Sequence, residues 1–316
     1  MMSVIAKSSK PTIRTMKDRD GWKLFWMAMP FMVFIFVFAY MPLWGWSFAF
    51  VNYRPGRSLL NSTFVGWKNF TTLFAQPAMR NRLLEVLRNT LCMQLLNYMF
   101  SVLPMFFAVF LNEMRSTKFR KFVQTVTTLP NFISWVIVYS LAYGMFAVDT
   151  GFVNNLLKSF GLIETGIPFL SSSDHVWFKM AVLDLWKSLG WSAIVYLAAI
   201  AGIDHEVLEA AEVDGAGRMR RIWHIVLPQL IPTFFVLLVM SIGNFLNTGM
   251  EQQKLFSNAM TKPYIETLDL YVYNMGIGSG LISYSTAVGM MKSVIAVVLF
   301  AGANLVSKKI RGESMF

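Results

Sequence analysis

The sequence predicts an all-α integral membrane protein with six transmembrane helices and a short cytoplasmic helix between the fourth and the fifth. Three observations lead to this fold class. The composition is 55% hydrophobic and 14% charged, whereas soluble domains carry about 25% charged residues. Six apolar stretches are each long enough to cross a bilayer core of about 30 Å. One polar stretch between two of them, residues 203–228, has the pattern of a helix.

The apolar stretches are taken as spans in chain order. Residues 1–23 are polar and basic and predict a cytoplasmic tail, followed by a transmembrane domain over residues 24–307 and a second cytoplasmic tail over 308–316. The first apolar stretch is too long for the core of a signal peptide, so we expect it to be retained. Pro104 is expected to kink the second span. The expected spans are residues 24–48, 85–111, 122–146, 176–201, 223–246 and 285–306.

The net charge of +11 is explained by membrane topology rather than by nucleic acid, since the basic residues flank apolar spans. With the N-terminus inside, sixteen of the 28 Lys and Arg residues lie in cytoplasmic segments and ten lie outside. Both termini are therefore expected in the cytoplasm. The single Cys92 excludes an intrachain disulfide, and the three His residues lack zinc-ligand spacing, so no metal site is expected.

The polar stretch 203–228 predicts a helix, a tight turn and a second helix that enters the fifth span. Asp204 is a plausible N-cap, and Gly215 is placed to end the helix. Ala210 and Ala211 leave room for another surface, and Glu209 offers a charge at that contact. Two interpretations follow from these residues. The helix either passes a partner's movement into the spans, or it belongs to an ordinary amphipathic loop that basic residues anchor to the membrane.

Two charged residues lie deep within the fourth span, where charges are costly inside a bilayer and commonly face a cavity or a partner. Asp184 and Lys187 are three residues apart on one helical face, with Ser188 and Trp191 nearby. They either line a route across the membrane or simply neutralise one another. Lys292 in the sixth span is expected to extend its amine outward to the membrane surface.

Around the end of the fifth span the sequence predicts a polar stripe on an otherwise apolar helix. Two amides and a carboxylate in this stripe suit a hydroxyl-rich ligand. Interhelical hydrogen bonding is the alternative, because membrane bundles use it to hold helices together. The residues of the stripe are Ser241, Asn244, Asn247, Thr248 and Glu251.

Residues 209–228 resemble a known motif. Glu209-Ala210-Ala211, three residues, Gly215, nine residues, Ile225, one residue and Leu227-Pro228 is similar to the EAA motif of permease subunits of binding-protein-dependent ABC importers. In that family the motif is the coupling helix, which docks on the ATPase subunit. The resemblance implies the type I importer transmembrane fold. The implied docking residues are Glu209, Ala210, Ala211, Asp214, Gly215 and Arg218.

From Trp22 to the C-terminus the chain resembles the oligosaccharide branch of these permeases. Segments 131–135, 151–155, 247–252 and 269–273 carry this wider resemblance. It implies a sugar site near the membrane midplane, on the spans that flank the docking loop. Lys187 and Lys292 would suit an acidic sugar.

The chain carries no ATPase of its own, because no Gly-Lys dipeptide occurs and a phosphate-binding loop is therefore impossible. ATP and Mg²⁺ are expected on a partner ATPase, with no cofactor on this chain and no enzymatic activity. The expected partners are a second, different permease subunit, an ATPase dimer, an extracytoplasmic binding protein, an oligosaccharide and membrane lipid, but no nucleic acid. The expected location is the cytoplasmic membrane of a bacterium.

Two other functions stay open at this point. One is a permease of the same kind for peptides or amino acids. The other is a secondary transporter driven by an ion gradient, for which inverted repeats would be expected, and no internal repeat is evident.

Overall fold

A computed structural model describes residues 18–311, and their contacts divide the chain into two compact units with the boundary between Ser47 and Phe48. The predicted tail residues 1–17 and 312–316 lie outside the described part. The first unit is one apolar helical path with Pro30 inside it, and it covers the predicted first span. Its elements are α1 (Asp18–Ile35), the π-helix η1 (Phe36–Tyr40) and the 3-10 helix η2 (Met41–Phe50), which continues across the boundary.

The second unit begins with a small hairpin followed by a surface helix. The connection between its two strands turns at Gly56, which takes φ +88°, and the Arg57 N–H donates to the Arg54 carbonyl over 3.2 Å. Val51 pairs with Phe64 in antiparallel register. The elements are β1 (Val51–Asn52), η3 (Leu59–Asn61), β2 (Thr63–Phe64) and α2 (Lys68–Ala75).

The second span is longer than predicted and is interrupted. It begins at Pro77 rather than at Glu85, so the predicted boundary is wrong. Proline suits the first turn of a helix because the N–H it lacks would have no partner there. The stretch covers 36 residues, about 54 Å at 1.5 Å per residue, so its ends extend beyond the apolar core. The helix is interrupted at Ser101 and Val102, directly before Pro104, where the sequence predicts a kink. The interruption separates α3 (Pro77–Phe100) from α4 (Leu103–Asn112).

The third predicted span, residues 122–146, is not one continuous helix. Its two helical parts are bent by 108° relative to each other. At the break Ile133 and Ser134 are extended, and Ser134 Oγ accepts the N–H of Ile137 as an N-cap. The expectation of one unbroken span is therefore wrong, because apolar composition does not distinguish a straight helix from a broken one. The elements are α5 (Thr117–Thr128), η4 (Leu129–Phe132) and α6 (Trp135–Phe146).

The fourth span, α8 (Val176–Ala201), has the predicted bounds and occupies the centre of the second unit, in contact with α3, α4 and α5. A Cβ atom on Gly190 would overlap the backbone of Thr127 in α5. The glycine therefore permits close backbone contact between the two helices, as small residues do in membrane bundles. The connection before α8 contains the short helix α7 (Phe152–Ser159).

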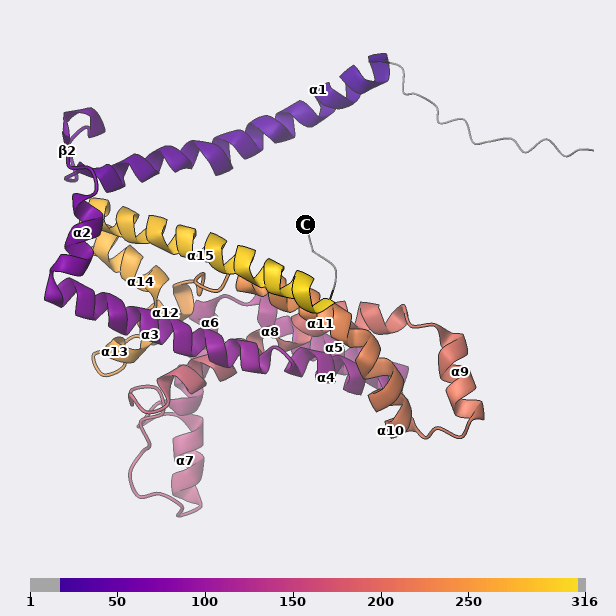
Figure 1. Ribbon diagram of the computed structural model, residues 1–316. Helices are drawn as coiled ribbons and strands as arrows, with labels where there is room; N and C mark the ends of the chain where they lie inside the picture. The colour runs from indigo at the N-terminus through magenta and orange to yellow at the C-terminus, as the bar shows by residue number, and fades with distance from the viewer. Residues whose placement is uncertain (1–17, 312–316) are drawn as a thin grey trace, which may run out of the picture. The chain divides into compact units, whose positions relative to one another are not determined.

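A polar segment projects from one end of this bundle, which we call the α9 end (Figure 1). It consists of two short helices joined by a turn in which Gly215 takes φ +76°. The fifth span follows and ends as a helix at Ile242, not at Leu246 as the sequence predicts. The elements are α9 (His205–Val213), α10 (Arg218–Arg221), the π-helix η5 (Ile222–Val226) and α11 (Leu227–Ile242).

After α11 the chain folds back onto α3 at the opposite end of the bundle, which we call the α2 end. Asn89 Nδ2 donates to the Glu266 carbonyl over 3.1 Å, and the buried Glu266 carboxylate pairs with Arg82. Asn274 Nδ2 also donates to Glu266, over 2.7 Å. These bonds fix the connection in place. Its elements are α12 (Glu251–Phe256), α13 (Lys262–Ile265), α14 (Leu268–Tyr273) and the π-helix η6 (Asn274–Gly278).

The sixth span is α15 (Ile282–Arg311), which continues into the predicted C-terminal tail. Lys292 in this helix forms an ion pair with Asp269 of α14. The expectation that Lys292 extends to the membrane surface is therefore wrong, because a carboxylate lies within its reach inside the bundle.

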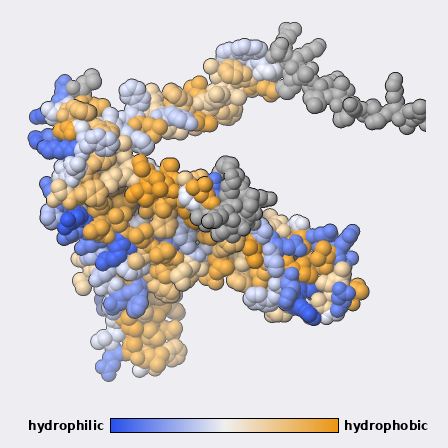
Figure 2. All heavy atoms as spheres, viewed as in Figure 1, coloured by the Kyte–Doolittle hydropathy of each residue, from blue (hydrophilic) through white to orange (hydrophobic). Residues whose placement is uncertain are grey.

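The hydropathy of the second unit is that of a membrane protein. Hydrophobic residues cover its middle in Figure 2, whereas hydrophilic residues gather at the α2 end and around α9 and α10. By length and composition, four helical stretches among the described residues are able to cross a membrane, and six if each bent pair counts as one span.

Candidate functional site

A polar cavity lies between the central spans of the second unit. One part, of about 330 Å³, is enclosed by α3, α4, α8 and α11. A second part, of about 260 Å³, lies toward α12 and shares Asn97, Ala181 and Asp184 with the first. We call the two parts together the polar cavity. Its lining side chains with polar atoms are Gln94, Asn97, Ser101, Asp184, Ser188, Trp191, Ser192, Tyr196, Ser241, Asn247, Thr248, Gln252 and Gln253.

Asp184 is the ionisable residue that lines both parts of the polar cavity. Its carboxylate makes no hydrogen bond or ion pair within residues 18–311, whereas its backbone carbonyl accepts from Ser188 Oγ over 2.8 Å. Lys187 makes no hydrogen bond or ion pair with this carboxylate, although its charge still acts on it. Instead Lys187 Nζ donates to the Asn131 carbonyl over 2.9 Å and lies 5.6 Å from the centre of the Trp135 ring. The Asp184 carboxylate is therefore free to accept hydrogen bonds from a ligand in the cavity.

Trp191 and two serines complete the part of the cavity that the sequence analysis identified. The Trp191 side chain is 49% exposed and meets Phe132 edge-to-face at 5.6 Å, which leaves a ring surface open to the cavity. Ser188 and Ser241 donate to backbone carbonyls of their own helices and keep lone pairs for a ligand. A flat aromatic surface beside hydroxyl and carboxylate acceptors suits a polyhydroxylated ring.

The predicted polar stripe does not follow one helix, so that interpretation is wrong. Helix α11 ends at Ile242 and the chain continues through a series of turns, in which Gly249 takes φ +69°. The turns place Asn247 and Thr248 in the polar cavity with Ser241. The other two members of the stripe, Asn244 and Glu251, are exposed and do not line the cavity.

The structure adds polar residues that the sequence analysis missed. Gln94, Asn97 and Ser101 line the cavity from the second span, and their i, i+3, i+7 spacing within an apolar helix could have revealed them. From α12, Gln252 Nε2 donates to the Met180 carbonyl over 2.9 Å. Gln253 Oε1 is buried without a hydrogen-bond partner among the described residues. Such an acceptor is stabilised when water or a ligand donates to it.

The predicted docking segment is an exposed helix whose ends are capped as its sequence indicates. Asp204 Oδ1 accepts the Glu206 N–H over 2.9 Å at the N-terminus of α9. At the other end the Ala216 N–H donates to the Ala211 carbonyl over 2.9 Å, which closes the turn at Gly215. No residue of α9 is buried within the second unit. The helix thus presents nearly its whole surface to a partner.

One ion pair lies within the docking segment and another connects the segment to the bundle. Arg221 Nη1 lies 2.6 Å from Glu212 Oε2 and joins α10 to α9. Arg218 pairs with Glu113, the residue directly after α4. The docking segment is therefore linked to the end of the second span and, through η5, to the fifth span. Glu113 was not singled out by the sequence analysis, because this contact joins residues 105 positions apart.

Comparison of the sequence with known protein families identifies the family of this chain. Residues 93–312 match the family described as "Binding-protein-dependent transport system inner membrane component". The chain belongs to this family. The matched residues include α8, the whole docking segment and α11, so the family assignment covers both features described above.

Two relatives of this inner membrane component come from Bacillus subtilis (strain 168). Protein LplB is 41% identical over 301 residues, which cover 94% of this chain and 92% of that protein. The polygalacturonan/rhamnogalacturonan transport system permease protein YteP is 40% identical over 317 residues, covering 99% of this chain and 96% of that protein.

A solved structure supports the same fold. The inner membrane component matches a chain of a bacterial alginate ABC transporter, crystallised in complex with an alginate pentasaccharide-bound periplasmic protein, with a TM-score of 0.84. The match has 33% sequence identity and covers 96% of this chain and 100% of that chain. The fold is therefore the all-α, six-span transmembrane fold of type I ABC importers, and the chain is a membrane-embedded transport subunit.

Proposed function

We propose that this chain is one of two permease subunits of an ATP-driven importer that passes an oligosaccharide across the cytoplasmic membrane of a bacterium. The observation that carries the proposal is the polar cavity between α3, α8 and α11, with the unpaired Asp184 carboxylate and the open Trp191 ring. The amides, hydroxyls and one carboxylate that line the cavity can form hydrogen bonds with the many hydroxyl groups of a sugar, whereas an apolar solute would leave them without partners. The carbohydrate named for the YteP permease supports the same substrate class.

Within this proposal, the substrate pathway uses lining residues from three spans. Asp184 and Asn97 accept or donate hydrogen bonds where the two parts of the cavity meet, and Trp191 supplies a stacking surface. Lys187 holds the break between η4 and α6 to α8 through its bond to Asn131. It is a positioning residue rather than a ligand for the sugar.

The exposed helix α9 is the proposed docking site for an ATPase dimer that carries ATP and Mg²⁺. The residues assigned to this contact are those that match the EAA motif, namely Glu209, Ala210, Ala211, Asp214, Gly215 and Arg218. This assignment places the α9 end and both termini in the cytoplasm and the α2 end outside. An extracytoplasmic binding protein then delivers the sugar at the α2 end. The second permease subunit is a different protein in this proposal.

The proposed mechanism is alternating access. Closure of the ATPase dimer moves α9, and the Arg221–Glu212 pair passes this movement to α10. The Arg218–Glu113 pair then passes it to the end of α4, and the continuous chain through η5 passes it to α11. The cavity then opens toward the binding protein and receives the sugar. Hydrolysis of ATP returns the spans and releases the sugar, chemically unchanged, into the cytoplasm.

Reconstitution tests the proposal. The chain is co-expressed with the subunits encoded beside its gene, and uptake of labelled oligosaccharides into ATP-loaded proteoliposomes is measured with the binding protein outside. We expect uptake that requires ATP and the binding protein. Uptake without ATP would support an ion-coupled transporter instead, and uptake of peptides or amino acids alone would overturn the substrate class.

A further inference from the structure

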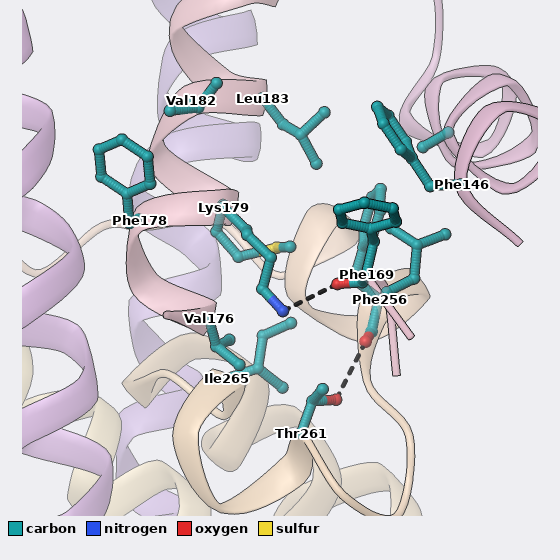
Figure 3. Close-up of a pocket in the computed structure, with 13 residues that line it drawn as sticks. Phe146, Phe169, Val176, Phe178, Lys179, Val182, Leu183, Phe256, Thr261 and Ile265 are labelled. Atoms are coloured by element: carbon teal, nitrogen blue, oxygen red, sulfur yellow. Dashed lines mark hydrogen bonds between the residues drawn. The ribbon is translucent and has the colours of Figure 1, made fainter. Parts of the chain in front are cut away.

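A second cavity, of about 240 Å³, has the opposite chemistry to the polar cavity (Figure 3). It lies between α6, α8, the chain before α8, and the α12–α13 region. We call it the apolar cavity. Its walls are aromatic and aliphatic side chains, and Lys179 and Thr261 are the lining residues with polar side chains. Its lining side chains include Phe146, Phe169, Met180, Leu183, Phe256 and Ile265.

The apolar cavity differs from the sugar pathway in position and in chemistry. At 100° per residue, Lys179, Val182 and Leu183 of its α8 lining point about 180° away from Ala181, Asp184 and Ser188, which line the polar cavity. The two cavities therefore lie on largely opposite faces of α8, and Met180 borders both of them. A sugar would find almost no hydrogen-bond partner in the apolar cavity, so it is not a continuation of the pathway.

Lys179 provides the charge at this cavity. Its Nζ donates to the carbonyls of Phe169 and Ser172 over 2.8 Å and 2.9 Å, as Figure 3 shows for Phe169. An ammonium group has three N–H donors, so one remains. Lys179 forms no ion pair within the residues that the structure describes, although the Asp174 carboxylate, which accepts from Ser172 Oγ, lies near enough to attract it. The cavity thus offers carbon surface and one cationic donor.

The position of the cavity decides which ligand can reach it. Lys179 is in the first turn of α8, at the α2 end, and the proposed topology puts this end at the outer face of the membrane. Phe178 and Val182, which border the cavity, are 51% and 40% exposed. The cavity rim is therefore open on the surface of this chain, and in the proposed topology Lys179 lies on the side of the outer headgroups.

We propose that the apolar cavity binds one acyl chain of an anionic phospholipid from the outer leaflet, with the headgroup at Lys179 Nζ. A cavity with such walls stays dry and takes an apolar ligand, and the bilayer supplies acyl chains at its rim. A cation near the membrane surface favours an anionic headgroup by about fivefold over a zwitterionic one. The leaflet rests on the proposed function, whereas the cavity and its charge do not.

Native mass spectrometry of the complete importer tests this site. The complex is purified in detergent and titrated with phosphatidylglycerol or with phosphatidylcholine of the same acyl chains. We expect half-occupancy at about fivefold lower phosphatidylglycerol concentration. Lys179→Gln should equalise the two lipids. Ala142→Phe, which fills the cavity, should retain one lipid fewer, and Leu141→Phe is the matched control on the exposed face of α6.

Several results would overturn the proposal. Equal binding of the two lipids by the unmodified complex would overturn it. This test needs no variant, so it remains available if Ala142→Phe fails to assemble. A cross-link between a Val182→Cys variant and the second permease subunit would also overturn the proposal, because protein would then cover the rim. Sugar uptake by the same preparation keeps the two proposals apart. Uptake without lipid retention refutes this site alone, and lipid retention without uptake refutes the transport function.

Discussion

The ion pair between Glu113 and Arg218 leads to a prediction about coupling. It is the contact that ties the end of α4 to the segment behind the docking helix. We expect Glu113→Arg and Arg218→Glu each to weaken the transmission of α9 movement to the second span. The combined reversal restores an attractive pair in the opposite sense, so the double variant should recover most of the lost coupling.

The size of the effect follows from the exposure of the pair. The Arg218 and Glu113 side chains are 50% and 27% exposed, so water screens their attraction. Measured exposed pairs contribute about 0.2–1 kcal/mol, and like charges at the same place repel by similar amounts. A single reversal therefore changes the linkage by about 1 kcal/mol, which corresponds to about a fivefold change in an equilibrium constant.

The assay measures how many ATP molecules the reconstituted importer hydrolyses for each sugar taken up. Each single reversal should raise this ratio by up to about fivefold, and the double variant should return it to within about twofold of the unmodified importer. Arg220→Glu is the matched control, because Arg220 is in the same short helix and makes no ion pair among the described residues. Its effect should not depend on the residue at position 113.

Two results would refute this reasoning. If the single reversals leave the ratio unchanged, the pair does not transmit movement. If the two reversals combine additively, the two residues act independently of each other. In either case α9 would have to act on the spans through η5 and α11 alone.

Three further predictions concern the docking helix, the polar cavity and helix packing. Glu209→Lys should abolish transport while the subunit still inserts into the membrane, as cell fractionation would report, and normal transport would remove the docking assignment. Asp184→Asn should lower the apparent affinity of sugar uptake about fivefold, because a charge-assisted hydrogen bond is about twice as strong as a neutral one. Lys187→Gln should change the same apparent affinity less than twofold. Equal effects of the two substitutions would argue against Asp184 as a sugar ligand. Gly190→Ala should destabilise the subunit by about 1–3 kcal/mol because its Cβ overlaps backbone, while Gly144→Ala, with open space around it, should not. Thermal unfolding followed by fluorescence would compare them, and equal stability would contradict the close packing of α5 and α8.

The sequence by itself determined the features that depend on local chemistry. The length of apolar stretches predicted the spans, because a bilayer core requires a minimum number of residues. Asp204 and Gly215 predicted the ends of α9, because capping uses side chains and backbone angles within a few positions. The spacing from Glu209 to Pro228 indicated the family, which the match over residues 93–312 confirms.

Only the tertiary structure decided which polar side chains share a cavity. Asn97 and Asp184 come from different spans, and Lys187, one helical turn from Asp184, turns away to Asn131. The break at Ile133 was missed as well, because the hydropathy averaged over a span does not register Pro130 and Asn131 just before it. Side-chain direction and helix breaks depend on contacts between residues far apart in the chain. Periodicity within one span carries no information about those contacts.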